Sequence, residues 1–277
     1  MIDVIEKRRS VRTYEKRKLS EKDKTRVREL LESSELLKGP FGNRAHWFYR
    51  DSDYVESDKP VQIGTYGMVK NPPAFVGGSI LNTFQGLVDY GYLFEYIILE
   101  LTKEDFGTVW LGGTFDRKAF DNILNDGEII PAISAVGYAA EHKSIVETFT
   151  RFGVNANHRR PFSDLFFENS LLMPITQDKR LLNRFSKYLE LVRLAPSATN
   201  QQPWRIITDG NHVHFYLKRT LNYGKNLHFD IQAVDLGIAI CHFEVGLNED
   251  RINYIIRPSE RAEIIPGLDY IASFEVE

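Results

Sequence analysis

The feature that most constrains this sequence is an internal repeat. The stretch VDYGYLFEYIILEL at 88–101 aligns with VDLGIAICHFEVGL at 234–247, and Val, Asp, Gly, Glu and Leu recur in register. Trp47 and Trp204 take equivalent places after the first helix of each predicted half. A long repeat usually corresponds to structural units that cover each other's apolar faces, so we expect an intramolecular pseudo-dimer. The alternative is a chance likeness between two similar helix–strand patterns.

The order of the predicted elements also repeats. Apolar spacing and capping residues predict, for the first half, helices at 20–37, 82–101 and 116–124 and strands at 46–50, 74–80, 107–113 and 130–138. For the second half they predict helices at 178–194 and from 230, and strands over WRIIT, HVHFYLK, RINYIIRP and DYIASFEVE. The polar, turn-rich stretch at 141–164 is expected to connect the halves, which we place at 1–165 and 166–277.

Composition excludes several classes of protein. The 277 residues are 43% apolar with a net charge of -3, which suits a globular core and gives no electrostatic case for a nucleic-acid or membrane partner. The single cysteine, Cys241, cannot form an intrachain disulfide, and no cysteine or histidine spacing resembles a metal site. MIDVIEKRRS lacks the apolar core of a signal peptide, and no apolar run could span a bilayer. We therefore expect a soluble, cytoplasmic protein.

Three stretches could carry chemistry. KRRSVR at 7–12 combines arginines with a hydroxyl, which suits a phosphate because guanidinium groups pair bidentately with its oxygens. The alternatives are a solvated basic patch and a chance likeness to a phosphorylation or nuclear signal. In GTVWLGG, Gly112 and Gly113 end a buried strand, where a backbone N–H can approach a ring without interference from a Cβ. A tight turn before a helix would explain this glycine pair equally well.

The third stretch is APSATNQQPW at 195–204. The amides of Asn200 and Gln202 offer donors and acceptors that match a heterocycle, and Pro196 and Pro203 stiffen the loop. The alternative is a loop that ends its helix and does nothing more.

Taken together, RRSxR, a WLGG strand end, PSxxNxQPW and a late basic–Pro stretch resemble the FMN-dependent nitroreductase family. The closest resemblance is to its tandem branch, in which one chain holds two half-units. The resemblance covers nearly the whole chain. It implies an α+β fold with a mixed sheet flanked by helices and an internal tandem repeat that forms a pseudo-dimer.

The resemblance also implies roles for individual residues. Arg8 and Ser10 would bind the FMN phosphate, with Arg9 in the same motif, while Arg12 would lie near the N1 and O2 edge of the flavin. Arg159 matches the late basic residue at the phosphate, with Arg160 as its substitute. The loop residues Pro196, Ser197, Ala198 and Asn200 would line the flavin and ribityl chain, with Gln202 as a weaker contact. Gly113, with Gly112 beside it, would offer its N–H to flavin N5.

In this family each FMN lies between two subunits, which makes a mirror site testable here. That site would need a basic cluster, where this chain has SLLMPITQDKR, and a PSxxN loop, where it has GPFGNRAHW. It would also need a glycine pair near RINYIIRPS, and the pair is absent. We therefore predict one FMN per chain, in a monomer.

The activity implied is NAD(P)H-driven reduction of a nitroaromatic, quinone or similar small acceptor by ping-pong hydride transfer through FMN, with no catalytic side chain. Alternatives are a same-fold enzyme with different flavin chemistry, a flavin-binding protein without turnover and, least favoured, a nucleic-acid role for KRRSVR. We expect Trp110 and Phe115 to be core residues, with contact to the substrate slot as the alternative for Phe115. The histidines His212, His214 and His242 are expected to have surface or satisfied-core roles. The glycines of GTYG at 64–67 are expected to form a turn.

Overall fold

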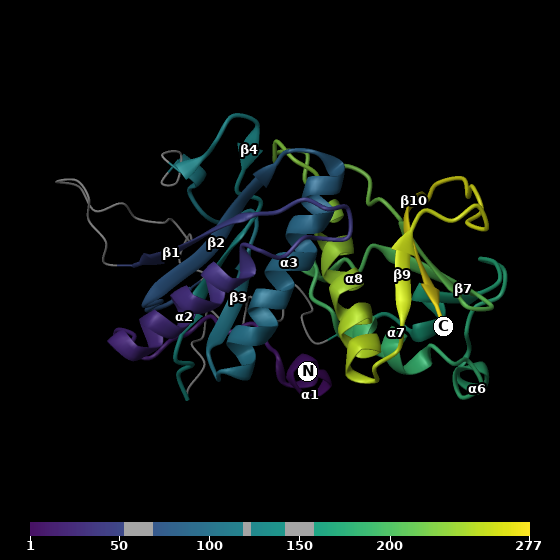
Figure 1. Cartoon of the computed structure of the whole chain (residues 1–277), viewed down its shortest axis with the longest axis horizontal. Coiled ribbons are helices and arrows are strands. Elements are labelled where there is room, and N and C mark those ends of the chain that lie inside the picture. The colour runs from purple at the N-terminus through teal and green to yellow at the C-terminus, as the bar shows by residue number, and fades with distance from the viewer. Residues whose placement is uncertain (53–68, 119–122, 142–157) are drawn as a thin grey trace.

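Two five-stranded sheets lie on either side of a central pair of long helices, α3 (Phe84–Lys103) and α8 (Ile231–Glu249) (Figure 1). The computed structural model describes residues 1–52, 69–118, 123–141 and 158–277. The predicted stretch 64–67, most of the connection at 141–164 and part of the helix at 116–124 lie outside these residues. No described helix is long and apolar enough to cross a membrane.

The first sheet belongs to the N-terminal half. Its order is β1 (His46–Asp51), β2 (Ala74–Leu81), β5 (Ile133–Gly137) and β3 (Gly107–Leu111), and β4 (Glu128–Ile129) pairs with β2. All neighbouring strands are antiparallel. Helix α2 (Glu21–Ser34) packs against β1 and α3. It begins at Ser20, whose Oγ accepts the N–H of Asp23 at 3.1 Å, as the capping pattern predicts.

The second sheet belongs to the C-terminal half. Its order is β6 (Phe166–Glu168), β7 (Trp204–Asp209), β8 (His212–Leu217), β10 (Asp269–Val276) and β9 (Tyr254–Arg257). The β6–β7 pair is parallel, so this sheet is mixed. The remaining helices are α1 (Ile2–Lys7), α5 (Phe162–Leu165), α6 (Gln177–Arg180), α7 (Ser186–Leu194) and the 3-10 turn η2 (Ala198–Asn200).

The α+β class and the two long helices are confirmed, but the helix expected at 178–194 is wrong as one element. It is broken into α6 and α7, and the side chain of Asn183 accepts the N–H of Phe185 at 2.9 Å between them. Asparagine often competes for backbone groups in this way. Leu181 and Leu182 of this break are exposed, so they do not continue the apolar stripe. Helix α1 and strand β6 were not predicted.

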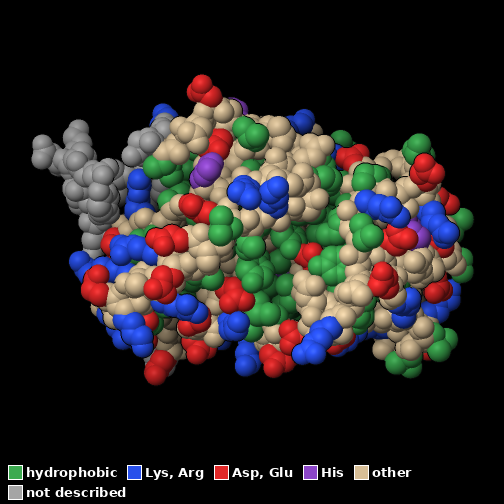
Figure 2. All heavy atoms as spheres, viewed as in Figure 1, with side chains coloured by type: hydrophobic (Ala, Val, Ile, Leu, Met, Phe, Trp, Pro, Cys, Tyr) green, Lys and Arg blue, Asp and Glu red, His purple; other side chains and the backbone are tan. Residues whose placement is uncertain are grey.

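The two central helices cross at a pair of glycines. A Cβ on Gly91 would lie 2.0 Å from the carbonyl oxygen of Val234, and one on Gly237 would lie 1.9 Å from that of Val88. No other residue type fits at either position, and the two contacts are reciprocal. Figure 2 shows hydrophobic side chains gathered where the two halves meet, with charged side chains over their outer surfaces. The boundary between residues 165 and 166 stays a prediction.

Candidate functional site

A cavity of about 600 Å³ lies between the two halves. Its wall includes eleven of the twelve predicted site residues: Arg8, Arg9, Ser10, Arg12, Gly112, Gly113, Arg159, Pro196, Ser197, Ala198 and Asn200. Helix α8 supplies Ile231, Val234, Asp235 and Ile238. The cavity therefore brings together segments that are far apart in the sequence.

The RRSVR stretch reaches the cavity because it runs beside β3. Ser10 bridges to Thr108 in parallel, and the N–H of Val11 donates to the carbonyl of Thr108 at 2.8 Å. Since β3 continues directly into Gly112 and Gly113, the arginines and the glycine pair share one side of the cavity.

The loop after α7 forms another wall. The N–H of Ala198 donates to Asp235 Oδ1 at 2.8 Å, which ties the loop to α8. Thr199 and Asn200 have φ values of 44° and 58°, a left-handed conformation that asparagine tolerates better than most residues. The loop therefore does more than end α7, because it is bound to α8 and lines the cavity.

Gln202 is not part of the cavity wall. Its side chain is buried, and its Oε1 accepts the N–H of Arg160 at 2.9 Å. Its own N–H donates to Ser197 Oγ at 2.9 Å. Gln202, predicted as a weak ligand contact, thus stabilises the loop through hydrogen bonds on the side away from the cavity. Arg160 is also not among the lining residues, and its Nε donates to the carbonyl of Gln201 at 3.3 Å.

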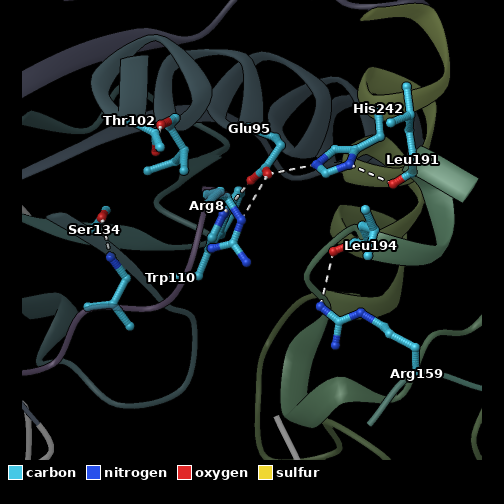
Figure 3. Close-up of polar contacts among 11 residues, drawn as sticks. Arg8, Glu95, Thr102, Trp110, Ser134, Arg159, Leu191, Leu194 and His242 are labelled. Atoms are coloured by element: carbon cyan, nitrogen blue, oxygen red, sulfur yellow. Dashed lines mark hydrogen bonds and ion pairs between the residues drawn. The ribbon is translucent and has the colours of Figure 1, made fainter. Parts of the chain in front are cut away.

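Arg8, whose side chain is 6% exposed, and the partly buried Arg159 supply positive charge to the cavity. Arg159 donates to Asn200 Oδ1 at 2.9 Å. It also donates to the carbonyl of Leu194 at 3.0 Å (Figure 3). Burial, with smaller effects from the positive charges of Arg8 and Arg193, lowers the pKa of Arg159 to about 10. Arginines that destabilise each other's charge in this way form a site that an anion would stabilise.

Arg8 and Arg159 form the basic wall of the cavity. Glu95 of α3 lies between Arg8 of this basic wall and Trp110 near the end of β3. It is fully buried, accepts the indole N–H of Trp110 at 2.7 Å and lies 3.9 Å from Arg8 Nε (Figure 3). Its other contact is His242 Nε2 at 2.9 Å, while His242 Nδ1 faces the carbonyl of Leu191 at 2.9 Å. A carbonyl only accepts, so Nδ1 donates to Leu191. His242 thus has a core role of the kind expected, as a buried hydrogen-bonding link between Glu95 and Leu191.

Arg117, which no sequence motif singles out, binds the backbone at the glycine pair. Its guanidinium donates to the carbonyls of Gly112, Pro131 (2.9 Å) and Ile130 (3.2 Å). A Cβ on Gly112 would lie 2.9 Å from Ile231 Cδ1, whereas a Cβ on Gly113 would have nothing within 4 Å. Packing therefore restricts the residue at Gly112. At Gly113, a lining residue, the adjacent space is open.

The loop at 39–43 is the counterpart, in the first half, of the loop at 195–204. Asp89 of the first half binds this loop. Asp89 accepts the N–H groups of Phe41 and Asn43 and the side-chain amide of Asn43, each at 2.8 Å. Gly39 leaves no room for a Cβ, which would lie 2.4 Å from Asp89.

Other expectations have mixed outcomes. Trp110 lines the cavity as well as packing on the core, whereas Phe115 is buried and is not a lining residue. His214 is buried. Among the described residues, no group of His, Cys, Asp and Glu could hold a metal ion.

Residues 1–247 match the family model described as "Putative TM nitroreductase". The chain therefore belongs to this nitroreductase family. No curated protein sequence matches it.

Among solved structures, the chain is similar to a "putative nitroreductase" from Thermotoga maritima, with 21% identity and a TM-score of 0.61. That likeness covers 99% of this chain and 93% of the other, and shows that the two share a fold. A nitroreductase with bound FMN from Bacteroides fragilis is 17% identical over 52% of this chain and 90% of its own length, with a TM-score of 0.37. An FMN-dependent nitroreductase from Clostridium difficile is 18% identical over the same share of this chain and 90% of its own, with a TM-score of 0.36.

Proposed function

We propose that the chain is a flavin oxidoreductase that binds one FMN between its halves and uses it to reduce a small acceptor with electrons from NAD(P)H. The observation that carries this proposal is a cavity in which the 6% exposed side chain of Arg8, the partly buried Arg159, an open glycine and a fixed loop meet. Family membership supports the same class of activity.

The residues present fit FMN. The volume lies within the range of pockets that hold cofactors of this size. Arg8 and the partly buried Arg159 supply positive charge for a phosphate, and Ser10 a hydroxyl. The open space at Gly113 allows a flat ring to approach the backbone.

When bound, FMN supplies two-electron hydride chemistry. The protein's part is placement and electrostatics. The Gly113 N–H would face flavin N5, and Arg117 would keep this backbone in place through the carbonyl of Gly112. The charge of Arg12 near the N1 edge would stabilise the anionic reduced flavin and so raise its reduction potential.

We expect NAD(P)H and the acceptor to use one open slot in turn, which implies ping-pong kinetics. The acceptor would be a nitroaromatic, a quinone or a compound of similar shape. Because Asp89 already binds the loop at 39–43, we place no second flavin in the first half.

The proposal is tested by measuring the flavin-to-chain ratio of the purified protein and then mixing it anaerobically with NADH or NADPH in a stopped-flow instrument. Bleaching of the flavin absorbance with either donor is the expected result. Bound flavin that neither donor bleaches would indicate a flavin-binding protein without turnover. A protein that binds no FMN would overturn the proposal altogether.

A further inference from the structure

Asp89 and Asp235 occupy the same position in the two copies of the repeat, and each holds the loop that precedes a strand. Asp89 Oδ1 accepts the N–H of Phe41 at 2.8 Å, and Asp235 Oδ1 accepts the N–H of Ala198 at 2.8 Å. The two loops are therefore attached to α3 and α8 by equivalent hydrogen bonds.

The second oxygen distinguishes the two carboxyl groups. Asp89 Oδ2 accepts both the backbone and the side-chain N–H of Asn43 at 2.8 Å. Asp235 Oδ2 has no hydrogen-bond partner among the residues that the structure describes. Asn200, at the place of Asn43, instead donates its side-chain amide to the carbonyl of His158 at 2.6 Å and accepts from Arg159.

Asp235 is 2% exposed and is one of the residues that line the cavity. A buried polar atom without a hydrogen-bond partner destabilises the fold. A bound ligand that hydrogen-bonds Oδ2 would remove this penalty. Burial raises the pKa of Asp235 well above its usual range, although the hydrogen bond from Ala198 opposes this effect. Because Oδ1 accepts the N–H of Ala198, Oδ2 is the oxygen that carries the proton whenever this carboxyl is protonated.

We infer that Asp235 is a ligand-binding residue whose Oδ2 hydrogen-bonds a hydroxyl group of the bound cofactor, in the polyol chain of the flavin. This inference rests on the proposed function. A hydroxyl both donates and accepts, so it satisfies a carboxylic acid in either role. The polyol chain links phosphate to ring, and Asp235 holds a loop whose Asn200 bonds to Arg159 of the basic wall.

The test compares the binding of riboflavin, which has the polyol chain, and lumiflavin, which lacks it, to flavin-free protein by fluorescence titration. Asp235→Ala should raise the dissociation constant for riboflavin about tenfold more than that for lumiflavin, because the lost tie to Ala198 affects both flavins and the lost Oδ2 contact only riboflavin. Asp235→Asn should restore riboflavin binding, because its amide accepts from Ala198 and still offers a donor. The matched control Asp89→Asn should lower stability and leave both affinities unchanged.

Equal losses for riboflavin and lumiflavin would show that Asp235 acts only through the loop, and would overturn the inference. Unchanged riboflavin binding in Asp235→Ala, or no restoration by Asp235→Asn, would do the same. If wild-type protein binds no flavin of either kind, the proposed function itself has failed.

A second measurement does not depend on the folding of the alanine variant. Infrared difference spectra of the wild type should show the stretching band of a protonated carboxyl shift on addition of riboflavin and not of lumiflavin. The band should be missing in Asp235→Asn. A wild-type spectrum in which riboflavin shifts neither the protonated-carboxyl band nor a carboxylate band would contradict the contact.

Discussion

Gly91 of α3 and Gly237 of α8 face each other across the crossing of the central helices, each against a backbone carbonyl of the partner helix. The Cβ positions, at 2.0 Å from Val234 O and 1.9 Å from Val88 O, leave no space for any side chain. This contact has the reciprocal geometry of an interface between identical subunits, although it lies within one chain. It brings together the two halves that form the cavity.

Gly237→Ala should therefore lower the free energy of unfolding by about 3 kcal/mol or more, because backbone must move to admit the methyl group. Urea unfolding followed by circular dichroism measures this quantity. Helix propensity alone would favour alanine by about 1 kcal/mol, so a more stable variant would contradict the close approach.

Gly113→Ala should leave stability nearly unchanged, since its Cβ would have no neighbour within 4 Å. It should weaken FMN binding about tenfold, because the methyl group enters the space proposed for the ring. Thermal unfolding and a flavin titration on the same preparation separate the two effects. Unchanged FMN affinity would show that the ring lies elsewhere.

Arg8→Ala should reduce the amount of FMN that co-purifies with the chain and raise its dissociation constant at least about tenfold, by removing a charge from the basic wall. Asn43→Ala is the matched change at the counterpart loop. It should reduce thermal stability, because Asp89 loses a partner, and leave the FMN content unchanged. Equal loss of flavin in both variants would contradict the assignment of one site.

Stability should fall in mild acid through His214. Burial, assisted by the nearby charge of His212 and opposed by Asp209, lowers its pKa from 6.5 to about 4. A lowered folded-state pKa contributes full stability above pH 6.5 and loses it as the pH falls towards 4, because the unfolded chain takes up the proton first.

The expected loss from His214 is about 2 kcal/mol, measured as the free energy of unfolding in urea across this pH range. The variant His214→Gln should show a shallower pH dependence by up to one proton. The same slope in both proteins would show that other groups dominate the acid sensitivity.

The protein should be a monomer of 32.0 kDa in light scattering, because α3 and α8 already cover each other within the chain. A species of twice this mass would show that a further face mediates dimerisation.

The sequence alone predicted the two long helices, their equivalence and eleven of the residues that line the cavity. The helices follow from local rules, namely apolar periodicity and capping, whereas the lining residues were expected from the resemblance of their motifs to the nitroreductase family. The RRSVR and WLGG motifs lie in the first half and the PSxxN loop in the second, and residues of all three line the cavity between the halves.

Only the tertiary structure decided which polar groups meet. Glu95 and His242 are 147 residues apart in sequence, and Arg117 holds Gly112 from beyond a turn. Gln202 faces inward and not into the cavity, and Asp235 keeps an oxygen without a protein partner. Such pairings depend on how two halves pack across a glycine crossing, and no local pattern encodes the distance between side chains that folding brings together.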